Sequence, residues 1–188
     1  MSKGRLTKKQ ILSAFTALSD ELAARQTRGE LFVVGGAAMA LAYSDRRVTR
    51  DIDAIFEPKA VIYEAAHEVA ERLGLPDDWL NDAVKSFLPS ADANRRVVFS
   101  TPSLEVAAAS PQYLLAMKLL ASRVDQDTED IKVLYAECGF TAADEGMDLL
   151  ERYYPNHPLQ PKTQFLLEEL FGPASHTQGA VPPGNMGS

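Results

Sequence analysis

Apolar positions in the first part of the chain change from helical spacing to the short runs typical of strands. Over residues 7–24 they recur every three or four positions, which predicts an amphipathic helix with Thr7 as its N-cap and Gly29 as its end. Residues 31–34, with the sequence LFVV, form a short apolar run of the kind found in buried strands. The chain is therefore expected to open with a helix followed by a buried strand.

Two glycines and two aspartates mark the next segments. Gly35 and Gly36 break the first strand, and the helix formers after them predict the order strand, glycine turn, helix. After a polar loop, the sequence DIDAIF at residues 51–56 predicts a second strand. Because successive side chains of a strand point to opposite faces, Asp51 and Asp53 share one face, and the other face is apolar.

The remaining pattern predicts several helices and one more pair of strands. The expected helices are 60–73, 111–123, 128–137, 142–153 and 163–171, and the expected strands are 95–100 and 103–109. An aromatic-bearing segment at 77–88 receives no assignment. From Gly172 onward, small residues and prolines dominate without periodicity, which indicates a disordered tail.

Composition places the chain among ordinary globular proteins. Its 188 residues are 46% hydrophobic and 24% charged, which fits one domain or a compact catalytic core with a short helical extension. The single cysteine, Cys138, has no internal disulfide partner, and no apolar run approaches the roughly 18 residues of a membrane span. We therefore expect a cytoplasmic protein with no part in a membrane.

The net charge of the chain limits how it could bind a nucleic acid. The formal net charge is −7 and the sequence pI is about 5.0, so a broad electrostatic contact with a nucleic-acid backbone is not expected. Any contact with RNA must be confined to local patches. The candidate patch residues are Arg46, Arg47, Arg50, Arg95 and Arg96.

The aspartate pair is the strongest candidate for chemistry. Residues two apart on one strand face lie about 6.5 to 7 Å apart at the backbone, so Asp51 and Asp53 can converge on one or two metal ions. Mg²⁺, or Mn²⁺ in its place, prefers oxygen ligands and is commonly held by one or two carboxylates plus substrate phosphates. The alternative is an exposed edge strand with two solvated aspartates. Aspartate is disfavoured in strands, and two on one face favour the functional interpretation.

The glycine pair and a third acid extend this candidate site. Gly35 and Gly36 let the backbone approach a phosphate, although a tight strand-to-helix turn alone would also explain them. Combined with an aspartate pair 15 residues further along, the turn predicts a triphosphate site. Glu105 lies on an expected neighbouring strand and is a candidate third acid, which would deprotonate a hydroxyl or complete a two-metal site. Its alternative is a glutamate that faces water.

A lysine stands within an apolar helix further along. Lys118, in the sequence LLAMKLLA, is a candidate for contact with the triphosphate, and the alternative is a lysine that extends along the helix to solvent. Asp127 and Asp130 follow near the expected start of the next helix. Asp127 or Thr128 could serve only as the N-cap of that helix.

These motifs resemble a known superfamily. The string VVGGAAMALAYSDRRVTRDIDAIF is similar to the signature of nucleotidyltransferases of the DNA polymerase β-like superfamily, which pairs a Gly-Gly or Gly-Ser turn at a strand end with a later D-x-D motif. The downstream string KLLASRVDQDTEDI resembles the K…R…D-x-x-D pattern of the AbiEii and MenT-like toxin branch. The resemblance covers residues 31–134.

The resemblance implies a fold and a division of the chain. The fold is α+β, with a mixed central β-sheet flanked by helices and a helical C-terminal half. We accordingly expect a nucleotidyltransferase core with the N-terminal helix in residues 1–110, a helical C-terminal subdomain in 111–171 and the disordered tail in 172–188.

The resemblance also implies roles for individual residues. The nucleotide-binding set would be Gly35, Gly36, Arg47, Thr49, Lys118 and Asp127. The catalytic set would be Asp51, Asp53, Glu105, Lys118 and Asp130, of which Asp51 and Asp53 would bind the metal. Arg47 and Thr49 fill the first positions of an R-x-T-x-D-x-D motif. In the toxin branch the hydroxyl residue at the second of these positions can be a target of self-modification under antitoxin control, so phosphorylation of Thr49 is a hypothesis.

The predicted function is metal-dependent transfer of a nucleoside monophosphate from a nucleoside triphosphate (NTP) to an acceptor, with release of pyrophosphate. By resemblance the acceptor is the 3′ end of tRNA, and the protein is the toxin of a bacterial toxin–antitoxin pair with a cognate antitoxin as partner. Two alternatives stay open. One is an enzyme that modifies a small molecule or a protein hydroxyl, and the other is an inactive protein that keeps the fold as a binding or antitoxin module.

Overall fold

A five-stranded mixed sheet forms the centre of the computed structural model, which describes residues 5–121 and 123–173. The strands are β1 (Gly29–Val33), β2 (Ile52–Glu57), β3 (Leu80–Asn81), β4 (Arg96–Ser100) and β5 (Leu104–Ala108). Their order across the sheet is β3-β2-β1-β5-β4. β1 is antiparallel to β2 and parallel to β5, so the central strand belongs to both kinds of pairing.

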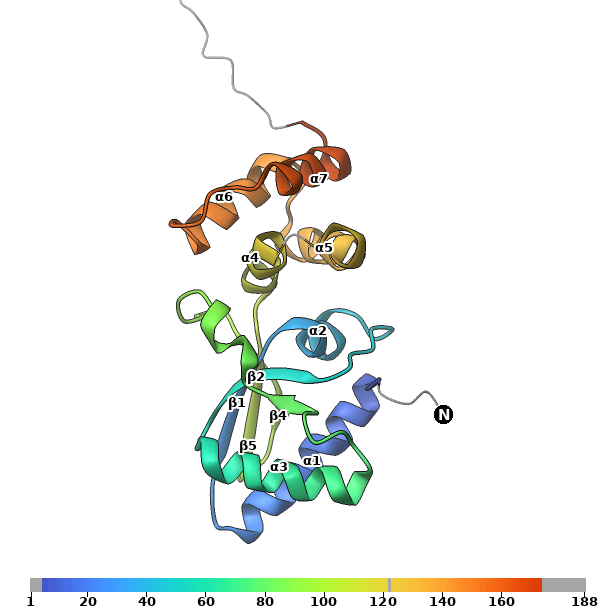
Figure 1. The fold of residues 1–188 in the computed structure, drawn as a ribbon, viewed down its shortest axis with the longest axis vertical. Helices are drawn as coiled ribbons and strands as arrows, with labels where there is room; N and C mark the ends of the chain where they lie inside the picture. The colour runs from blue at the N-terminus through green and yellow to red at the C-terminus, as the bar shows by residue number, and fades with distance from the viewer. Residues whose placement is uncertain (1–4, 122, 174–188) are drawn as a thin grey trace, which may run out of the picture.

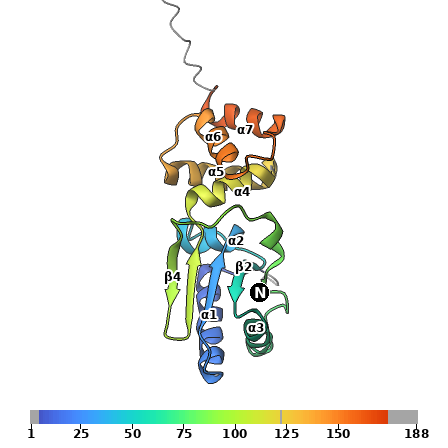
Figure 2. The ribbon, with the colours of Figure 1, turned by 90° about the vertical axis from the view of Figure 1, so that its left-hand side faces the viewer.

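Two helices cover one face of this sheet. α1 (Lys8–Ala24) and α3 (Lys59–Leu73) pack against each other on the same side of the strands (Figure 1; Figure 2). The strand side chains buried on that side are Leu31, Val33, Ile52, Ala54, Phe56, Leu104, Val106 and Ala108. Phe32 and Ile55, which alternate with them, are only half-buried. The sheet therefore has one fully covered face and one more open face.

The second half of the chain is helical and lies beyond one end of the strands (Figure 1). Its helices are α4 (Pro111–Ala121), α5 (Val124–Cys138), α6 (Ala143–Tyr153) and α7 (Pro161–Phe171). α4 packs on α5 and α6, and α7 packs on both of these. One continuous cluster of buried apolar side chains runs from the sheet into these helices.

The helix after the glycine turn is short and changes its geometry. α2 (Gly35–Ala38) continues directly into a π-helical turn, η1 (Met39–Tyr43). The hydroxyl of Tyr43 donates a hydrogen bond of 2.7 Å to the carbonyl oxygen of Ala109, just after β5. Burial raises the pKa of Tyr43 to about 12. The turn is thereby fixed to the end of the neighbouring strand.

The architecture confirms the α+β fold with a mixed central sheet flanked by helices and a helical C-terminal half. The first helix begins as expected, since the side chain of Thr7 accepts a hydrogen bond from the backbone N–H of Gln10. It ends at Ala24, however, and Gly29 opens β1 instead of ending the helix. A Cβ at Gly29 would lie 2.8 Å from Leu22 Cδ1 and 3.2 Å from Ile62 Cδ1, so this glycine lets β1 pack closely on α1 and α3.

Two other expectations need correction or completion. The unassigned segment 77–88 contains β3 and a 3₁₀ helix, η2 (Ala83–Phe87). The helix expected over 128–137 begins earlier, at Val124. The expected tail lies mostly in residues 174–188, outside the described residues.

Across residues 5–121 and 123–173, none of the helices is both long enough and apolar enough to cross a membrane.

Candidate active site

The glycine turn and the second strand meet at one point of the structure. The backbone N–H of Val34 donates a hydrogen bond of 3.0 Å to the carbonyl oxygen of Asp53. Gly35, the next residue, has a φ of +61°, a conformation that favours glycine. A Cβ at Gly35 would lie 3.3 Å from Asp53 Oδ2. The carboxylate of Asp53 therefore rests directly against the glycine turn, as the triphosphate-site interpretation requires.

The strand that carries the aspartates is an interior strand. β2 lies between β3 and β1, so the alternative of an exposed edge strand is wrong. The expected alternation is present from Ile52 to Phe56, because Ile52 and Phe56 are buried whereas Asp53 is half-buried on the open side. Asp51 directly precedes the strand and is also half-buried.

The electrostatics of Asp53 are those of an acid that its surroundings compensate only in part. Burial and, next, the negative charge of Asp51 raise the pKa of Asp53 above its usual range. A hydrogen bond from the Asn81 side chain and the positive charge of Arg123 oppose this shift without reversing it. Asp51 and Asp53 are thus close enough to repel each other, and a cation placed between them would relieve that repulsion.

The loop before the aspartates is tightly fixed. Thr49 exchanges backbone hydrogen bonds with Leu6, and its hydroxyl donates to the carbonyl oxygen of Asp51 at 2.9 Å. A Cβ at Gly36 would lie 2.8 Å from Thr49 Oγ1. Only a glycine therefore lets the turn and this loop approach so closely. Thr49 itself is half-buried beside the turn.

The third candidate acid lies elsewhere. Val34, just after β1, is hydrogen-bonded to Asp53 of β2. On the opposite edge of β1, the parallel register with β5 places Ala109 level with Val34. Glu105 stands four residues before Ala109, about 13 Å away along the strand. Its carboxylate instead forms an ion pair of 3.1 Å with Arg28. The structure therefore does not bring Glu105 to the aspartate pair.

No other acid takes that place among residues 5–121 and 123–173. Within them, no group of three or more His, Cys, Asp or Glu side chains is arranged to hold a metal ion. Any metal bound by the aspartate pair would need further ligands from a substrate, from amide or carbonyl oxygens, or from water.

The lysine and the late acids form one ion-pair network. Lys118 Nζ lies 2.5 Å from Asp127 Oδ1 and 2.8 Å from Asp130 Oδ2, and Arg47 Nη2 lies 2.9 Å from the same Asp130 oxygen. The Lys118 side chain is only 11% exposed, so the alternative of a lysine extending to solvent is wrong. Asp127 and Thr128 lie inside α5, whose N-cap position is Arg123, so the N-cap alternative is wrong for both residues.

This network joins the helical half to the loop before the aspartates. Arg47 lies two residues before Thr49 and reaches across to Asp130 on α5. Asp127 and Asp130 are both buried, with exposures of 8% and 4%, and two cations face these two anions. The Nε of Arg47 is buried and has no hydrogen-bond partner within the described residues. The network brings Arg47, Lys118, Asp127 and Asp130 together, with Lys118 already paired.

Comparison with known families identifies the chain. The family model DUF6036, described as a nucleotidyltransferase of unknown function, matches residues 9–149, most of the chain. The chain belongs to the DUF6036 family. The matched range includes the glycine turn, the aspartate pair and all four members of the ion-pair network. No match was found among curated proteins, and none among solved structures.

Two groups beside Asp53 in this DUF6036 protein received no role from the sequence. Asn81 pairs in register with Asp53 across β3 and β2, but a two-residue strand shows no periodicity that could have predicted it. Arg123 acts on Asp53 through its charge. Arg123 is the arginine of the K…R…D-x-x-D pattern, and its place in that pattern was the sequence signal that could have assigned it to the site.

Proposed function

We propose that this DUF6036 protein is a metal-dependent nucleotidyltransferase that moves a nucleoside monophosphate from an NTP to an acceptor hydroxyl. The observation that supports it most is the mutually repelling pair Asp51 and Asp53, of which Asp53 rests against the glycine turn. A purely structural role does not explain why two acids that repel each other lie at an interior strand of the sheet. A cation with a bound polyphosphate supplies that reason.

The donor set fits a divalent cation such as Mg²⁺ or Mn²⁺. Asp51 and Asp53 offer carboxylate oxygens, and the Asn81 amide lies beside Asp53. These are hard oxygen donors of the kind that Mg²⁺ prefers, and sites of this type take their remaining ligands from phosphates and water. When bound, the metal would neutralise phosphate charge and hold the triphosphate in place.

The phosphates are proposed to lie over Gly35 and Gly36. No side chain stands between the turn backbone and the Asp53 carboxylate, since a Cβ at Gly35 would already approach it at 3.3 Å. Arg123 is the nearby cation. The Nε of Arg47 has no hydrogen-bond partner in the described part of the chain but is buried, so a phosphate oxygen could reach it only if the Arg47 side chain moved. Lys118 can reach a phosphate only by exchanging one of its two aspartates for it.

The reaction forms one bond and breaks one. The acceptor hydroxyl oxygen bonds to the α-phosphorus, and the bond from this phosphorus to the oxygen bridging to the β-phosphorus breaks. Pyrophosphate leaves with that electron pair, and the hydroxyl proton passes to water. The chain contributes position and charge to this step, which are the principal means of catalysis in phosphoryl and nucleotidyl transfer.

The tRNA acceptor and the cellular role have the sequence resemblance as their only support. The toxin role with an antitoxin partner, the AbiEii and MenT-like relationship and the phosphorylation of Thr49 are proposals drawn from that resemblance. The resemblance also names the tRNA 3′ end as one acceptor to test, beside small hydroxyl-bearing molecules. The cations available to RNA are the exposed Arg46, Arg50, Arg95 and Arg96.

A transfer assay tests the proposal. The protein is incubated with each of the four NTPs, labelled at the α-phosphate, and Mg²⁺, in the presence of total tRNA or of small hydroxyl-bearing compounds. We expect labelled acceptor that disappears with EDTA and in the Asp53→Asn variant, and that persists in Asp20→Asn, which changes an exposed aspartate of α1. Label on the protein alone would mark self-modification. The absence of both label and NTP binding would contradict the proposal.

A further inference from the structure

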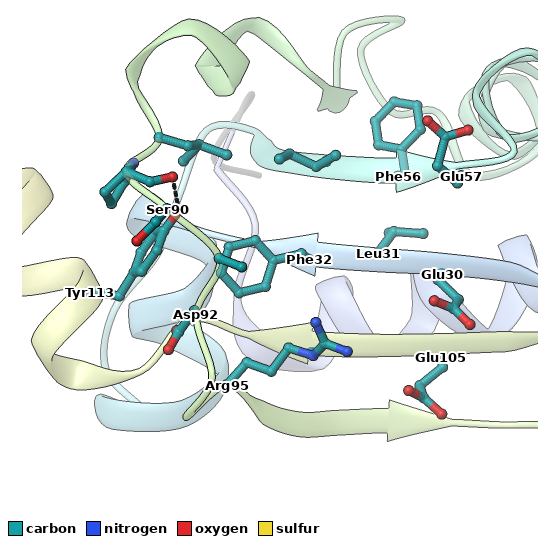
Figure 3. A pocket seen from close by; sticks show the side chains of 15 residues that line it. Glu30, Leu31, Phe32, Phe56, Glu57, Ser90, Asp92, Arg95, Glu105 and Tyr113 are labelled. Carbon is teal, nitrogen blue, oxygen red and sulfur yellow. Dashed lines mark hydrogen bonds between the residues drawn. The ribbon is translucent and has the colours of Figure 1, made fainter. Parts of the chain in front are cut away.

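A pocket of about 340 Å³ lies on the open face of the sheet (Figure 3). Its floor is apolar, with Phe32, Ile55 and Ala107 from three neighbouring strands. Tyr113 of α4 lies at one end, with its ring edge-to-face against Phe32 at 5.4 Å between centroids. An apolar concavity of this size with a few polar groups is the usual form of a small-molecule site.

Three glutamates form a row at the other end of the pocket. The strand registers pair Glu57 with Glu30 and Glu30 with Glu105, so the three lie side by side across β2, β1 and β5. Figure 3 shows their carboxylates in this order along one edge of the pocket. Neighbouring strands are about 4.8 Å apart, so the row is a closely spaced set of like charges.

Two of these three glutamates have no ion pair in the described residues. Glu105 has an ion pair with Arg28, whereas Glu30 and Glu57 have no ion-pair partner in the part of the chain that the structure describes. Arg95 is the single basic residue among those that line the pocket.

Asp92, the fourth acid of the lining, has polar partners of its own. Its carboxylate accepts hydrogen bonds from the backbone N–H and the hydroxyl of Ser110, at 2.7 and 3.0 Å. The row of glutamates is therefore the part of the pocket whose charge is left for a ligand.

The pocket is adjacent to the proposed reaction site. Ile55, in its floor, lies two residues after Asp53 on the same strand face, about 7 Å away. Glu57 lies two residues further, about 13 Å from Asp53. A molecule lying along the pocket could present one end to the aspartate pair and the other to the glutamate row.

We infer that this pocket binds the acceptor, and that the acceptor is a small molecule with amino groups at one end and the attacking hydroxyl at the other. This inference rests on the proposed nucleotidyl transfer. Ammonium groups complement the glutamate row, and the carbon skeleton between them and the hydroxyl covers the apolar floor. A phosphodiester backbone would instead meet a row of like charges, which disfavours RNA along this face.

Three probes that share one ring and differ in charge test the inference. They are 1,4-bis(aminomethyl)benzene, the neutral 1,4-bis(hydroxymethyl)benzene and terephthalate, each titrated into the full-length protein and followed by protein NMR. We expect the diamine to bind at least about tenfold more tightly than the diol, with shifts at Phe32 and Ile55, and terephthalate not to bind there. Diol binding equal to diamine binding would overturn the inference. Binding of terephthalate or of a short oligoribonucleotide at these residues, lost in Arg95→Gln, would overturn it in favour of an anionic acceptor.

Matched variants locate the contact. The double variant Glu30→Gln, Glu57→Gln should weaken diamine binding about tenfold, whereas Glu64→Gln on the exposed side of α3 should leave it unchanged. Equal diamine binding by the double variant and the wild type would contradict the assignment.

The two proposals fail separately in this design. Asp53→Asn should retain diamine binding, because Asp53 does not line the pocket. NTP binding without diamine binding would remove only the acceptor assignment. Diamine binding without NTP binding would leave a cation pocket and remove the transfer reaction.

Discussion

The aspartate pair and the ion-pair network both contain buried or half-buried acids. In the network these acids are paired with cations, whereas the aspartate pair has no such partner among the residues that the structure describes. In the network, Asp127 and Asp130 each have a cation within 3 Å. Asp51 and Asp53 have no ion-pair partner in the described part of the chain, and burial together with mutual repulsion raises the pKa of Asp53.

This difference predicts a structural role for the network and a binding role for the aspartate pair. The network is neutral in itself and ties α4 and α5 to the loop that carries Arg47, so its removal should affect folding first. The two aspartates repel each other, and on the proposed function a bound cation would relieve that repulsion. The following predictions test this separation.

The largest expected effect is the loss of transfer in Asp51→Asn and Asp53→Asn. Each substitution removes one negative charge from the proposed metal site while keeping the size of the side chain. We expect the rate of nucleotidyl transfer to fall at least about a thousandfold, which is about 4 kcal/mol of transition-state stabilisation. Thermal unfolding should show a melting temperature no lower than that of the wild type. A variant that unfolds would assign the pair a structural role.

The next effect concerns the network. Asp130→Asn removes the acid that both Lys118 and Arg47 contact, so we expect the free energy of unfolding to fall by about 3 kcal/mol. Its neighbour Glu129, which is exposed and pairs with Lys132 at 2.9 Å, is the control. Glu129→Gln should change stability by less than about 0.5 kcal/mol. Urea denaturation measures both, and equal effects would show that the network does not hold the helices.

A smaller effect is expected at the glycine turn. In Gly36→Ala the new Cβ would meet Thr49 Oγ1 at 2.8 Å, so we expect a loss of about 1 to 2 kcal/mol in stability. Adding Thr49→Ala removes the hydroxyl oxygen and should restore part of that loss. Thermal denaturation of both single variants and the double variant measures the coupling. Additive effects would mean that the turn and the loop do not constrain each other.

The smallest effect is on the pH dependence of stability. The pKa of Asp53 is raised in the folded protein, so the folded state binds its proton more readily than the unfolded state does. The resulting contribution is present below the unfolded pKa of about 3.9 and is lost as pH rises through the folded pKa. Without metal, Asp53→Asn should therefore gain stability relative to the wild type as pH rises, and Mg²⁺ should reduce that gain. A difference that does not vary with pH would contradict the account.

The sequence predicted the elements that have a strong local signal. Thr7 and the periodic apolar residues after it located α1, and the alternation around Asp53 located β2 and its open face. Glycines at a strand end predicted the turn beside that aspartate. In each case the neighbouring residues alone decide the structure.

The sequence could not predict what depends on register or on distant packing. Glu105 was assigned to the correct strand, but only the pairing of β1 with β5 shows that Ala109 is level with Asp53. Asn81 lies in a two-residue strand without a pattern of its own. The pairing of Lys118 with two acids arises from the packing of α4 on α5, which periodicity does not specify.

The most direct test of the central claim is calorimetric titration of the protein with a non-hydrolysable NTP analogue, with and without Mg²⁺. We predict binding by the wild type that requires the metal, and none by an Asp51→Asn, Asp53→Asn double variant that folds normally by circular dichroism. Binding that is equally tight without metal, or in the double variant, would contradict the claim that these two carboxylates hold a metal-bound nucleotide.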